Sequence, residues 1–156
     1  MASVTLRKTR ETRVRGGHPW IYASEIDRVD GGFENGDIVD VKDFRGKFIG
    51  RGFYNPHSQI SLRILTRNDE LCDRAFFERR IRDAWAYRQR LCDPESCRLV
   101  YSESDFLPGL VVDKFANTLV MQSLSLGIDR IKDMLCDLLM EIVQPDGIYE
   151  RSDVPV

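Results

Sequence analysis

The sequence predicts an α+β protein in which a small β-barrel at residues 1–67 precedes a mixed α/β domain at residues 68–156. Three observations lead to this fold class. In the first part, short segments that alternate apolar and polar residues are separated by glycine-containing turns. After residue 68, apolar residues recur with a helical period. The remainder combines a second amphipathic helix with several short strands, which predicts two helices packed against a short sheet.

Strands of the barrel are expected where the alternation is clearest. They are residues 4–6, 38–41, 48–54 and 60–65. Residues 20–23 open either a strand or a helical turn, and the Asp-Phe-Arg-Gly sequence at residues 43–46 predicts a tight turn. Gly50 and Gly52 lie inside a predicted strand, which indicates a bulge or the close approach of another backbone.

The second part begins with a predicted helix over residues 73–92 that takes Asp73 as its N-cap. Its apolar face is formed by Phe77, Ile81, Ala84, Trp85, Arg88 and Leu91. A second helix begins near Ile128, with a stripe formed by Ile128, Ile131, Leu135, Leu138, Leu139 and Ile142. Strands are expected at residues 99–101, 110–115, 118–124 and 148–150, with a hairpin turn at 116–117.

The composition is typical of a globular protein, with 42% hydrophobic and 31% charged residues in a chain of 156. No apolar run approaches the roughly 18 residues of a membrane span, and no apolar signal segment follows the basic N-terminus. We therefore expect a cytoplasmic protein without a membrane partner. The two histidines and the cysteine spacing predict no metal site. Free and mostly buried thiols are expected at Cys72, Cys92, Cys97 and Cys136.

Charge is distributed unevenly along the chain. The net charge is −2 overall, but residues 1–67 carry a balance of +4 and residues 68–156 a balance of −6. The first fifteen residues hold one acidic residue, Glu11, and a basic arm formed by Arg7, Lys8, Arg10, Arg13 and Arg15. Such asymmetry indicates contact with a polyanion. The alternative is a solvated basic terminus with no partner.

A rigid corner is predicted at Gly17-His18-Pro19-Trp20. Pro19 fixes its own φ angle and favours an extended conformation for the residue before it. Glycine allows close approach of a ligand to the backbone, and aromatic and imidazole rings stack on unpaired bases. The corner is therefore predicted to hold RNA, although Trp20 alone is also compatible with a place in the core. His18 lacks any recognisable partner for a role as catalytic base.

Other catalytic signatures are weak. The sequence contains neither a G-x-G-x-x-G nucleotide cradle nor a P-loop nor a G-x-S-x-G elbow. The acidic cluster at residues 102–105 precedes Pro108-Gly109 and is expected to form a capped loop. A complete small enzyme that uses His18, Asp105 and Asp113 in a cleft remains an alternative.

Three motifs carry a resemblance to a known family. GHPWIYASEI at residues 17–26, with residues 36–65 from GDIVDVKDFRG to ISLRIL, resembles the N-terminal PUA domain of bacterial large-subunit ribosomal RNA (cytosine-C5) methyltransferases. ESDFLPGLVVDKF at residues 103–115 and YERSDVP at residues 149–155 are similar to the central domain of the same S-adenosylmethionine (SAM)-dependent class I family. The resemblance covers nearly the whole chain, and three motifs in this order form a specific combination.

The resemblance implies that the PUA barrel binds ribosomal RNA and that the central domain connects it to a Rossmann-like catalytic domain. The chain ends at Val156, where that domain would begin, so a truncated enzyme is expected. We therefore expect no catalytic residue and no cofactor in this part, with SAM required by the full-length parent. A PUA-type interaction module of another RNA-modifying or ribosome-associated protein is the alternative, and homodimerisation is left open. The expected RNA-binding residues are Arg7, Lys8, Arg10, Arg13, Arg15, Gly17, His18, Trp20, Arg51, Asn55 and His57.

Overall fold

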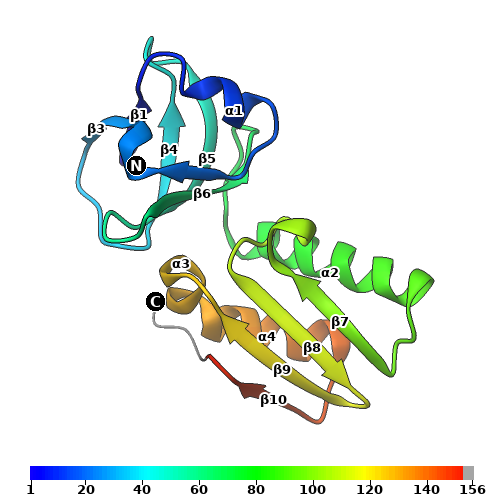
Figure 1. Ribbon diagram of the computed structural model, residues 1–156. Coiled ribbons are helices and arrows are strands. Elements are labelled where there is room, and N and C mark those ends of the chain that lie inside the picture. The colour runs from blue at the N-terminus through cyan, green and yellow to red at the C-terminus, as the bar shows by residue number, and fades with distance from the viewer. Residues whose placement is uncertain (153–156) are drawn as a thin grey trace. The chain divides into compact units, whose positions relative to one another are not determined.

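The computed structural model describes residues 1–152, which fall into two compact units. Met1–Leu71 forms the first unit, and the chain from Cys72 onward forms the second (Figure 1). The last part of the third sequence motif, residues 153–155, lies outside the described residues. The α+β class is confirmed, because a curled sheet in the first unit is followed by a second sheet with helices.

The first unit is built on one six-stranded sheet. Its strands are β1 (Ser3–Leu6), β2 (Trp20–Tyr22), β3 (Ile26–Asp30), β4 (Ile38–Lys42), β5 (Phe48–Tyr54) and β6 (Ile60–Thr66). They lie in the order β2-β6-β5-β4-β1-β3, and every neighbouring pair is antiparallel except β1 and β4. The connection from β1 to β2 contains the short helix α1 (Glu11–Arg15), and a 3₁₀ turn, η1 (Ala23–Glu25), precedes β3.

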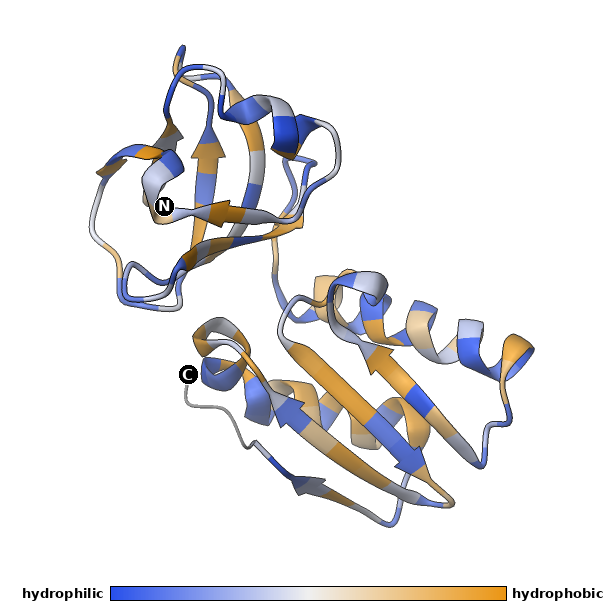
Figure 2. Cartoon of the chain, in the orientation of Figure 1, coloured by the Kyte–Doolittle hydropathy of each residue, from blue (hydrophilic) through white to orange (hydrophobic). Residues whose placement is uncertain are grey.

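A continuous apolar core fills the inside of this curled sheet. Val4 and Leu6 of β1, Val41 of β4 and Leu62 of β6 have no exposed surface, and Val14 of α1 packs into the same cluster. Burial of such side chains stabilises the fold by about 1.5–3 kcal/mol each. In Figure 2, hydrophobic and hydrophilic residues alternate along the strands, as expected for a sheet with one buried face.

The four barrel strands predicted from alternation are confirmed, and residues 20–23 begin as a strand. Two elements were not predicted. Helix α1 has five residues, four of them polar or charged, so Val14 alone marks its buried side. Strand β3 was not predicted because its apolar residues, Ile26 and Val29, are three residues apart and do not alternate with polar ones.

Gly52 marks the close backbone approach that the sequence predicted. The pairing of β5 with β6 shifts register between Arg51 and Gly52, as in a β-bulge. A Cβ atom on Gly52 would lie 2.2 Å from the carbonyl oxygen of Arg63 on the neighbouring strand. Only glycine fits at this crossing of the two strands.

The second unit pairs a four-stranded sheet with helices. Its strands are β7 (Ser96–Tyr101), β8 (Leu110–Phe115), β9 (Thr118–Ser123) and β10 (Gly147–Glu150), in the order β10-β9-β8-β7. Its helices are α2 (Arg74–Leu91), α3 (Leu126–Arg130) and α4 (Lys132–Val143), with the 3₁₀ turn η2 (Ser102–Asp105) after β7. Strands β7, β8 and β9 are antiparallel, whereas β10 runs parallel to β9. Helix α2 contacts both α4 and β7.

Helix α2 begins as predicted. The carboxylate of Asp73 accepts a hydrogen bond from the backbone N–H of Phe76 at 3.1 Å, so Asp73 is the N-cap. Phe77, Ile81 and Ala84 are buried as expected. Leu91 is not part of the buried face: it is 65% exposed, because it is the last residue of the helix.

The predicted second helix is two helices. Ile131 leaves the α conformation, with φ −112° and ψ 12°, and separates α3 from α4. The chain enters α3 through Ser125, whose hydroxyl accepts a hydrogen bond from the backbone N–H of Ile128. The apolar stripe survives this break, because Ile128, Leu135, Leu138 and Leu139 are all fully buried.

Two further expectations concern thiols and membranes. All four cysteines are free, but the expectation that most are buried is wrong: Cys92 is exposed, and Cys72, Cys97 and Cys136 are half-buried. Cys92 is the C-cap residue of α2 and therefore faces solvent. Within residues 1–152, no helix combines the length and hydrophobicity needed to cross a membrane.

We predict that Gly52→Ala destabilises the first unit by about 3 kcal/mol, because a methyl group would overlap the backbone of β6. Gly32→Ala is the matched control, since nothing lies within 4 Å of its added Cβ atom. Urea unfolding of both variants checks this. Equal midpoints for the two alanine variants would contradict the assigned backbone contact.

Candidate nucleic-acid interface

Asp43 ties the turn between β4 and β5 to helix α1. Its Oδ1 accepts the backbone N–H groups of Arg45 and Lys47, both at 2.9 Å. Its Oδ2 accepts a hydrogen bond from the Arg15 guanidinium of α1 at 2.7 Å. These donors, led by the Lys47 N–H, hold the pKa of the Asp43 carboxyl below its usual value against the opposing effect of burial. The turn is therefore fixed as one platform with α1.

This turn contains Phe44, whose ring has two cations near it. Phe44 is 40% exposed. The Lys8 ammonium lies 5.8 Å and the Arg45 guanidinium 5.3 Å from the centre of its ring. We name Lys8, Phe44 and Arg45 the Phe44 cluster. Such contacts hold cations over an aromatic ring.

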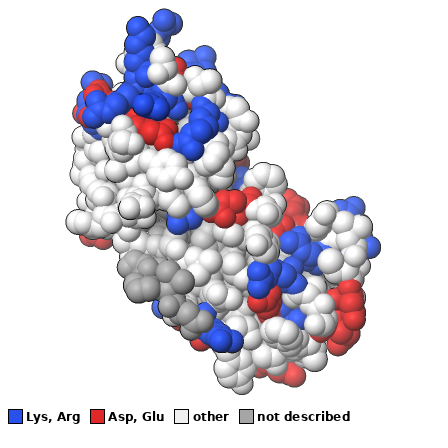
Figure 3. Space-filling model, viewed as in Figure 1, with Lys and Arg blue, Asp and Glu red and all other residues white. Residues whose placement is uncertain are grey.

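The charges around this cluster are largely uncompensated. In the part of the chain that the structure describes, no ion pair is formed by Lys8, Arg10, Arg45 or Lys47. All four side chains are exposed. Figure 3 shows Lys and Arg side chains gathered over α1 and the β4–β5 turn. A surface of this kind attracts phosphate groups.

The other arginines of the basic arm have acidic or carbonyl partners. Arg13 pairs with the buried Glu25 and donates to the Trp20 carbonyl at 3.2 Å. Arg7 donates to the Ser24 carbonyl at 3.2 Å and lies 3.6 Å from the carboxylate of Asp27. With Arg15 bound to Asp43, these side chains fasten β1 and α1 to the sheet. Their positive charge is partly neutralised.

The corner at residues 17–20 is rigid, as predicted. Gly17 has a φ angle of 110°, a conformation that favours glycine. The backbone N–H of His18 donates to the Arg13 carbonyl at 3.1 Å, and the Pro19 carbonyl accepts the Ile64 N–H at 2.8 Å. Arg67 closes the corner by donating to the carbonyls of Val14 and His18, both at 3.2 Å.

The rings of His18 and Trp20 contact each other in this corner. Nδ1 of His18 accepts the backbone N–H of Trp20 at 3.1 Å, so in this arrangement the imidazole carries its proton on Nε2. The two rings meet edge to face with centroids 6.0 Å apart. The Arg63 guanidinium lies 5.7 Å from the Trp20 ring. Trp20 is half-buried, so it is neither a core residue nor a freely exposed one.

Arg51, which the sequence predicted to bind RNA, is almost fully buried. It is 7% exposed, because its guanidinium donates to Asp40 at 2.6 Å, to Asp69 at 2.9 Å and to the Glu70 carbonyl. Its donors are thus satisfied inside the unit, where a phosphate cannot reach them. Arg51 is a structural residue that fixes the segment after β6 to the sheet.

Asn55 and His57 lie at the other end of β5 from the Phe44 cluster. The side chain of Asn55 accepts the His57 N–H at 3.0 Å and so caps the turn between β5 and β6. Strand β5 has seven residues, which corresponds to a length of about 23 Å. Trp20 pairs with Arg63 in the middle of β6, and Arg63 pairs with Phe53, so the register places Trp20 nearer the Asn55 end of β5 than the Phe44 end. The arm contacts both the corner, through Arg13 and the Trp20 carbonyl, and the β4–β5 turn, through Arg15 and Asp43, whereas Asn55 and His57 lie at the end of β5 away from that turn.

Sequence reasoning missed Phe44, Arg45 and Lys47. It identified the turn at residues 43–46 but assigned it no function. The available signal was a phenylalanine in a tight turn followed by Arg45 and Lys47.

The carboxylates of the alternative enzyme hypothesis are already engaged. Asp105 forms two hydrogen bonds with Arg88, at 3.0 and 2.7 Å. Asp113 forms two with Arg98, at 2.8 and 3.2 Å. Each carboxylate is thus occupied by a guanidinium of its own unit. Among residues 1–152, no three His, Cys, Asp or Glu side chains are grouped to bind a metal.

We predict that stability falls as the pH drops below about 4 and that Asp43→Asn reduces this fall. The pKa of Asp43 is lowered from 3.8 in the folded state, so the unfolded state binds more protons in that range. The contribution of Asp43 is complete above its unfolded pKa and is lost as the pH falls through the folded pKa. Urea midpoints measured from pH 7 downward test this. Asp30→Asn, in an exposed pair with Arg28, serves as control; equal acid sensitivity in both variants would contradict the role of Asp43.

Comparison with known proteins finds a family that matches the first unit and relatives that align with nearly the whole chain. Residues 4–67 match the model of the PUA-like domain family. The chain is 40% identical over 159 residues to "Ribosomal RNA large subunit methyltransferase I" of Alteromonas mediterranea. It is 43% identical over 157 residues to the protein of that name from Pseudoalteromonas atlantica. These alignments include 99% and 98% of the chain but 40% of each relative.

A solved structure shares the fold. A candidate SAM-dependent methyltransferase from Streptococcus mutans superposes with a TM-score of 0.83 at 12% identity, covering 97% of this chain and 41% of the other. A likeness at this identity concerns the fold alone. Residues 4–67 are therefore similar to PUA-like domains, and nearly the whole chain is similar to about two fifths of relatives named as large-subunit ribosomal RNA methyltransferases.

Proposed function

We propose that this chain is the RNA-binding portion of a SAM-dependent large-subunit ribosomal RNA methyltransferase and that it recruits ribosomal RNA for a catalytic domain outside it. The observation that carries the proposal is the unpaired basic surface around the Phe44 cluster on a PUA-like barrel. The similarity to methyltransferases named for ribosomal RNA supports the choice of RNA over other polyanions.

The proposed interface has two parts with different roles. Exposed cations at Lys8, Arg10, Arg45 and Lys47 attract phosphates from a distance and neutralise them on contact. The rings of Phe44, His18 and Trp20 offer edges and faces for stacking with unpaired bases. Gly17 leaves open space where a Cβ would stand, so RNA can approach the backbone there. Arg7, Arg13 and Arg15 support the surface and add a smaller share of charge.

Asn55 and His57 join this interface only with RNA that extends along β5 to its other end. A folded RNA segment or a single strand of several nucleotides has the required reach. Shorter RNAs bound at the Phe44 cluster would not touch these two residues.

The finer chemistry is proposed for the longer protein. There the reaction would be methyl transfer from SAM to C5 of a cytosine, which requires the base to leave its stack. We assign SAM to that longer protein and propose no site for it in residues 1–152. The sequence has no glycine-rich dinucleotide cradle, and the pocket of the second unit is lined by four arginines, which disfavour a sulfonium cation. The cell compartment that this function requires is the cytoplasm, where ribosomal RNA is modified in bacteria.

The alternative is a PUA-type interaction module of another RNA-modifying or ribosome-associated protein. The barrel and its basic surface serve that role equally well. The reading frame beyond Val156 discriminates between the two: a strand, a glycine-rich turn and a helix would support the methyltransferase, and a stop codon would favour the module.

We predict that Lys8→Ala/Arg45→Ala weakens binding to ribosomal RNA fragments by about tenfold at low salt. The slope of log K against log salt should become shallower by about 0.7 for each phosphate that the variant no longer neutralises. Fluorescence anisotropy across a salt series measures both. Arg28→Ala is the matched control, because Arg28 is exposed on the same unit but pairs with Asp30. An unchanged slope in the double variant would remove the Phe44 cluster from the interface.

We also predict that this chain alone transfers no methyl group, whereas the longer protein methylates cytosine C5 in large-subunit RNA. Radiolabelled SAM, followed by nucleoside analysis of the RNA, checks both statements. Methyl incorporation by the purified chain, or a labelled base other than cytosine, would contradict the respective part.

A further inference from the structure

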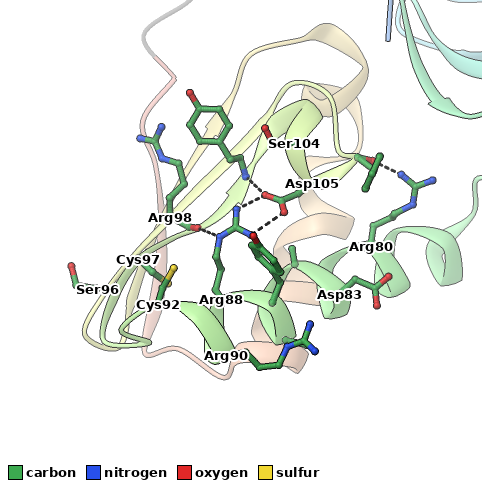
Figure 4. Close-up of a pocket in the computed structure, with 15 residues that line it drawn as sticks. Arg80, Asp83, Arg88, Arg90, Cys92, Ser96, Cys97, Arg98, Ser104 and Asp105 are labelled. Carbon is green, nitrogen blue, oxygen red and sulfur yellow. Dashed lines mark hydrogen bonds and ion pairs between the residues drawn. The ribbon is translucent and has the colours of Figure 1, made fainter. Parts of the chain in front are cut away.

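A pocket of about 830 Å³ lies in the second unit, between α2 and the segment formed by β7 and η2. It has no part in the barrel surface described above. Four arginines line it, together with three large aromatic side chains that are exposed to solvent: Arg80, Arg88, Arg90, Arg98, Tyr87, Tyr101 and Phe106. Its volume lies within the range typical of small-molecule and nucleotide sites. Figure 4 shows Arg80, Arg90 and Arg98 placed around the central Arg88 and Asp105.

The floor of the pocket is a fixed ion pair. The Arg88 guanidinium and the Asp105 carboxylate form two hydrogen bonds, and both side chains are about one tenth exposed. Nε of Arg88 donates to the Arg98 carbonyl at 2.8 Å, and Asp105 accepts the Tyr101 N–H at 2.6 Å. This network joins α2, β7 and η2. The pocket is therefore rigid before any ligand arrives, which lowers the entropic cost of binding.

The walls are aromatic rings backed by arginines. Tyr87 is 48%, Tyr101 50% and Phe106 64% exposed. Arg88 lies 5.0 Å from the Tyr87 ring and Arg98 lies 5.1 Å from the Tyr101 ring. Each ring is thus supported on one side by a cation, and its remaining exposed surface is available to another flat group.

Phe106 is held out of the core by its backbone. Its φ angle is 60° and its ψ angle 31°, in the left-handed region that a phenylalanine rarely adopts. The Arg80 guanidinium donates to its carbonyl at 2.7 Å and lies 5.4 Å from its ring. A strained backbone that keeps a large apolar ring in solvent is a feature of binding sites.

The pocket is electropositive. Its four arginines face two lining carboxylates, Asp83 and Asp105; Asp105 pairs with Arg88, and Arg98 pairs with Asp113 outside the lining. Arg90 is exposed, and no described residue forms an ion pair with it. Burial raises the pKa of the Cys97 thiol, which therefore adds no negative charge near neutral pH. The surplus charge suits an anionic ligand.

We propose that this pocket binds an unpaired nucleotide of RNA, with the base stacked on the tyrosine walls and its phosphate beside Arg90. The inference rests on the proposed function, because it gives the same RNA a second point of attachment. Every base has a face that stacks, and arginines at the rim neutralise the backbone, so aromatic and basic side chains together are typical of single-strand sites. Stacking without base-edge contacts predicts little sequence preference.

The test compares variants of the whole chain in binding to one fluorescein-labelled RNA, prepared both as a single strand and as a blunt duplex. Tyr87→Ala/Tyr101→Ala is expected to lose about tenfold or more in affinity for the single strand and little for the duplex. Arg90→Ala is expected to weaken binding and to make the salt dependence shallower. The matched controls are Tyr149→Ala, which removes an exposed tyrosine away from the pocket, and Arg82→Ala, which removes an arginine of α2 that pairs with Glu78. Both controls should bind as the unmodified chain does.

A second readout locates the contact directly. Ultraviolet cross-linking to single-stranded RNA, followed by trypsin, should label the peptides 83–88 and 99–114, which contain Tyr87 and Tyr101. Labels confined to peptides of the first unit would overturn the proposal.

The outcomes separate the two proposals. If Lys8→Ala/Arg45→Ala weakens binding and the pocket variants do not, the barrel function stands and the pocket proposal is wrong. If the unmodified chain binds neither RNA form, both fail. A last experiment measures binding of cytidine monophosphate and its displacement by single-stranded RNA. If the free nucleotide binds the pocket and RNA does not displace it, the pocket is a mononucleotide site and the RNA proposal is wrong.

Discussion

The barrel surface depends on one buried carboxylate, Asp43. It collects two backbone N–H groups of its own turn and the guanidinium of Arg15, and so converts a turn and a short helix into one platform. A five-residue helix has little stability of its own. Without this anchor, neither α1 nor the Phe44 ring would hold a defined position. The geometry of the exposed basic surface on the first unit is therefore set by an anion, although the surface itself is cationic.

Both units divide their arginines between two kinds of work. Arg51 and Arg88 are surrounded by carboxylates and carbonyls, and they hold segments together. Arg45 and Arg90 keep their charge exposed at the edge of an aromatic surface. A guanidinium whose N–H groups already have acceptors has few donors available for a phosphate, whereas an unpaired guanidinium can donate all of its N–H groups. The partners around each arginine, which only the fold brings together, decide its role.

Much of the architecture follows from local pattern. The alternation of apolar and polar residues predicted the barrel strands, and Asp73 predicted the start of α2. Gly52 predicted a close approach of two strands, where the structure leaves no room for a Cβ atom. The missed elements had no such pattern: α1 buries a single side chain, and the apolar residues of β3 do not alternate. The candidate site was only partly predictable. Residue type suggested Arg51, but its partners Asp69 and Glu70 are distant in sequence, and only strand direction separates Asn55 and His57 from the β4–β5 turn.

The exposed thiol at the end of α2 makes the second unit unusually accessible to chemistry. Cys92 lines the same pocket as Tyr87 and Tyr101, and it is the most solvent-accessible of the four cysteines. Burial raises the pKa of the Cys97 and Cys136 thiols, so these form thiolate less readily. The natural sequence thus supplies an attachment point for a spectroscopic reporter at the rim of the cavity, without any engineered residue.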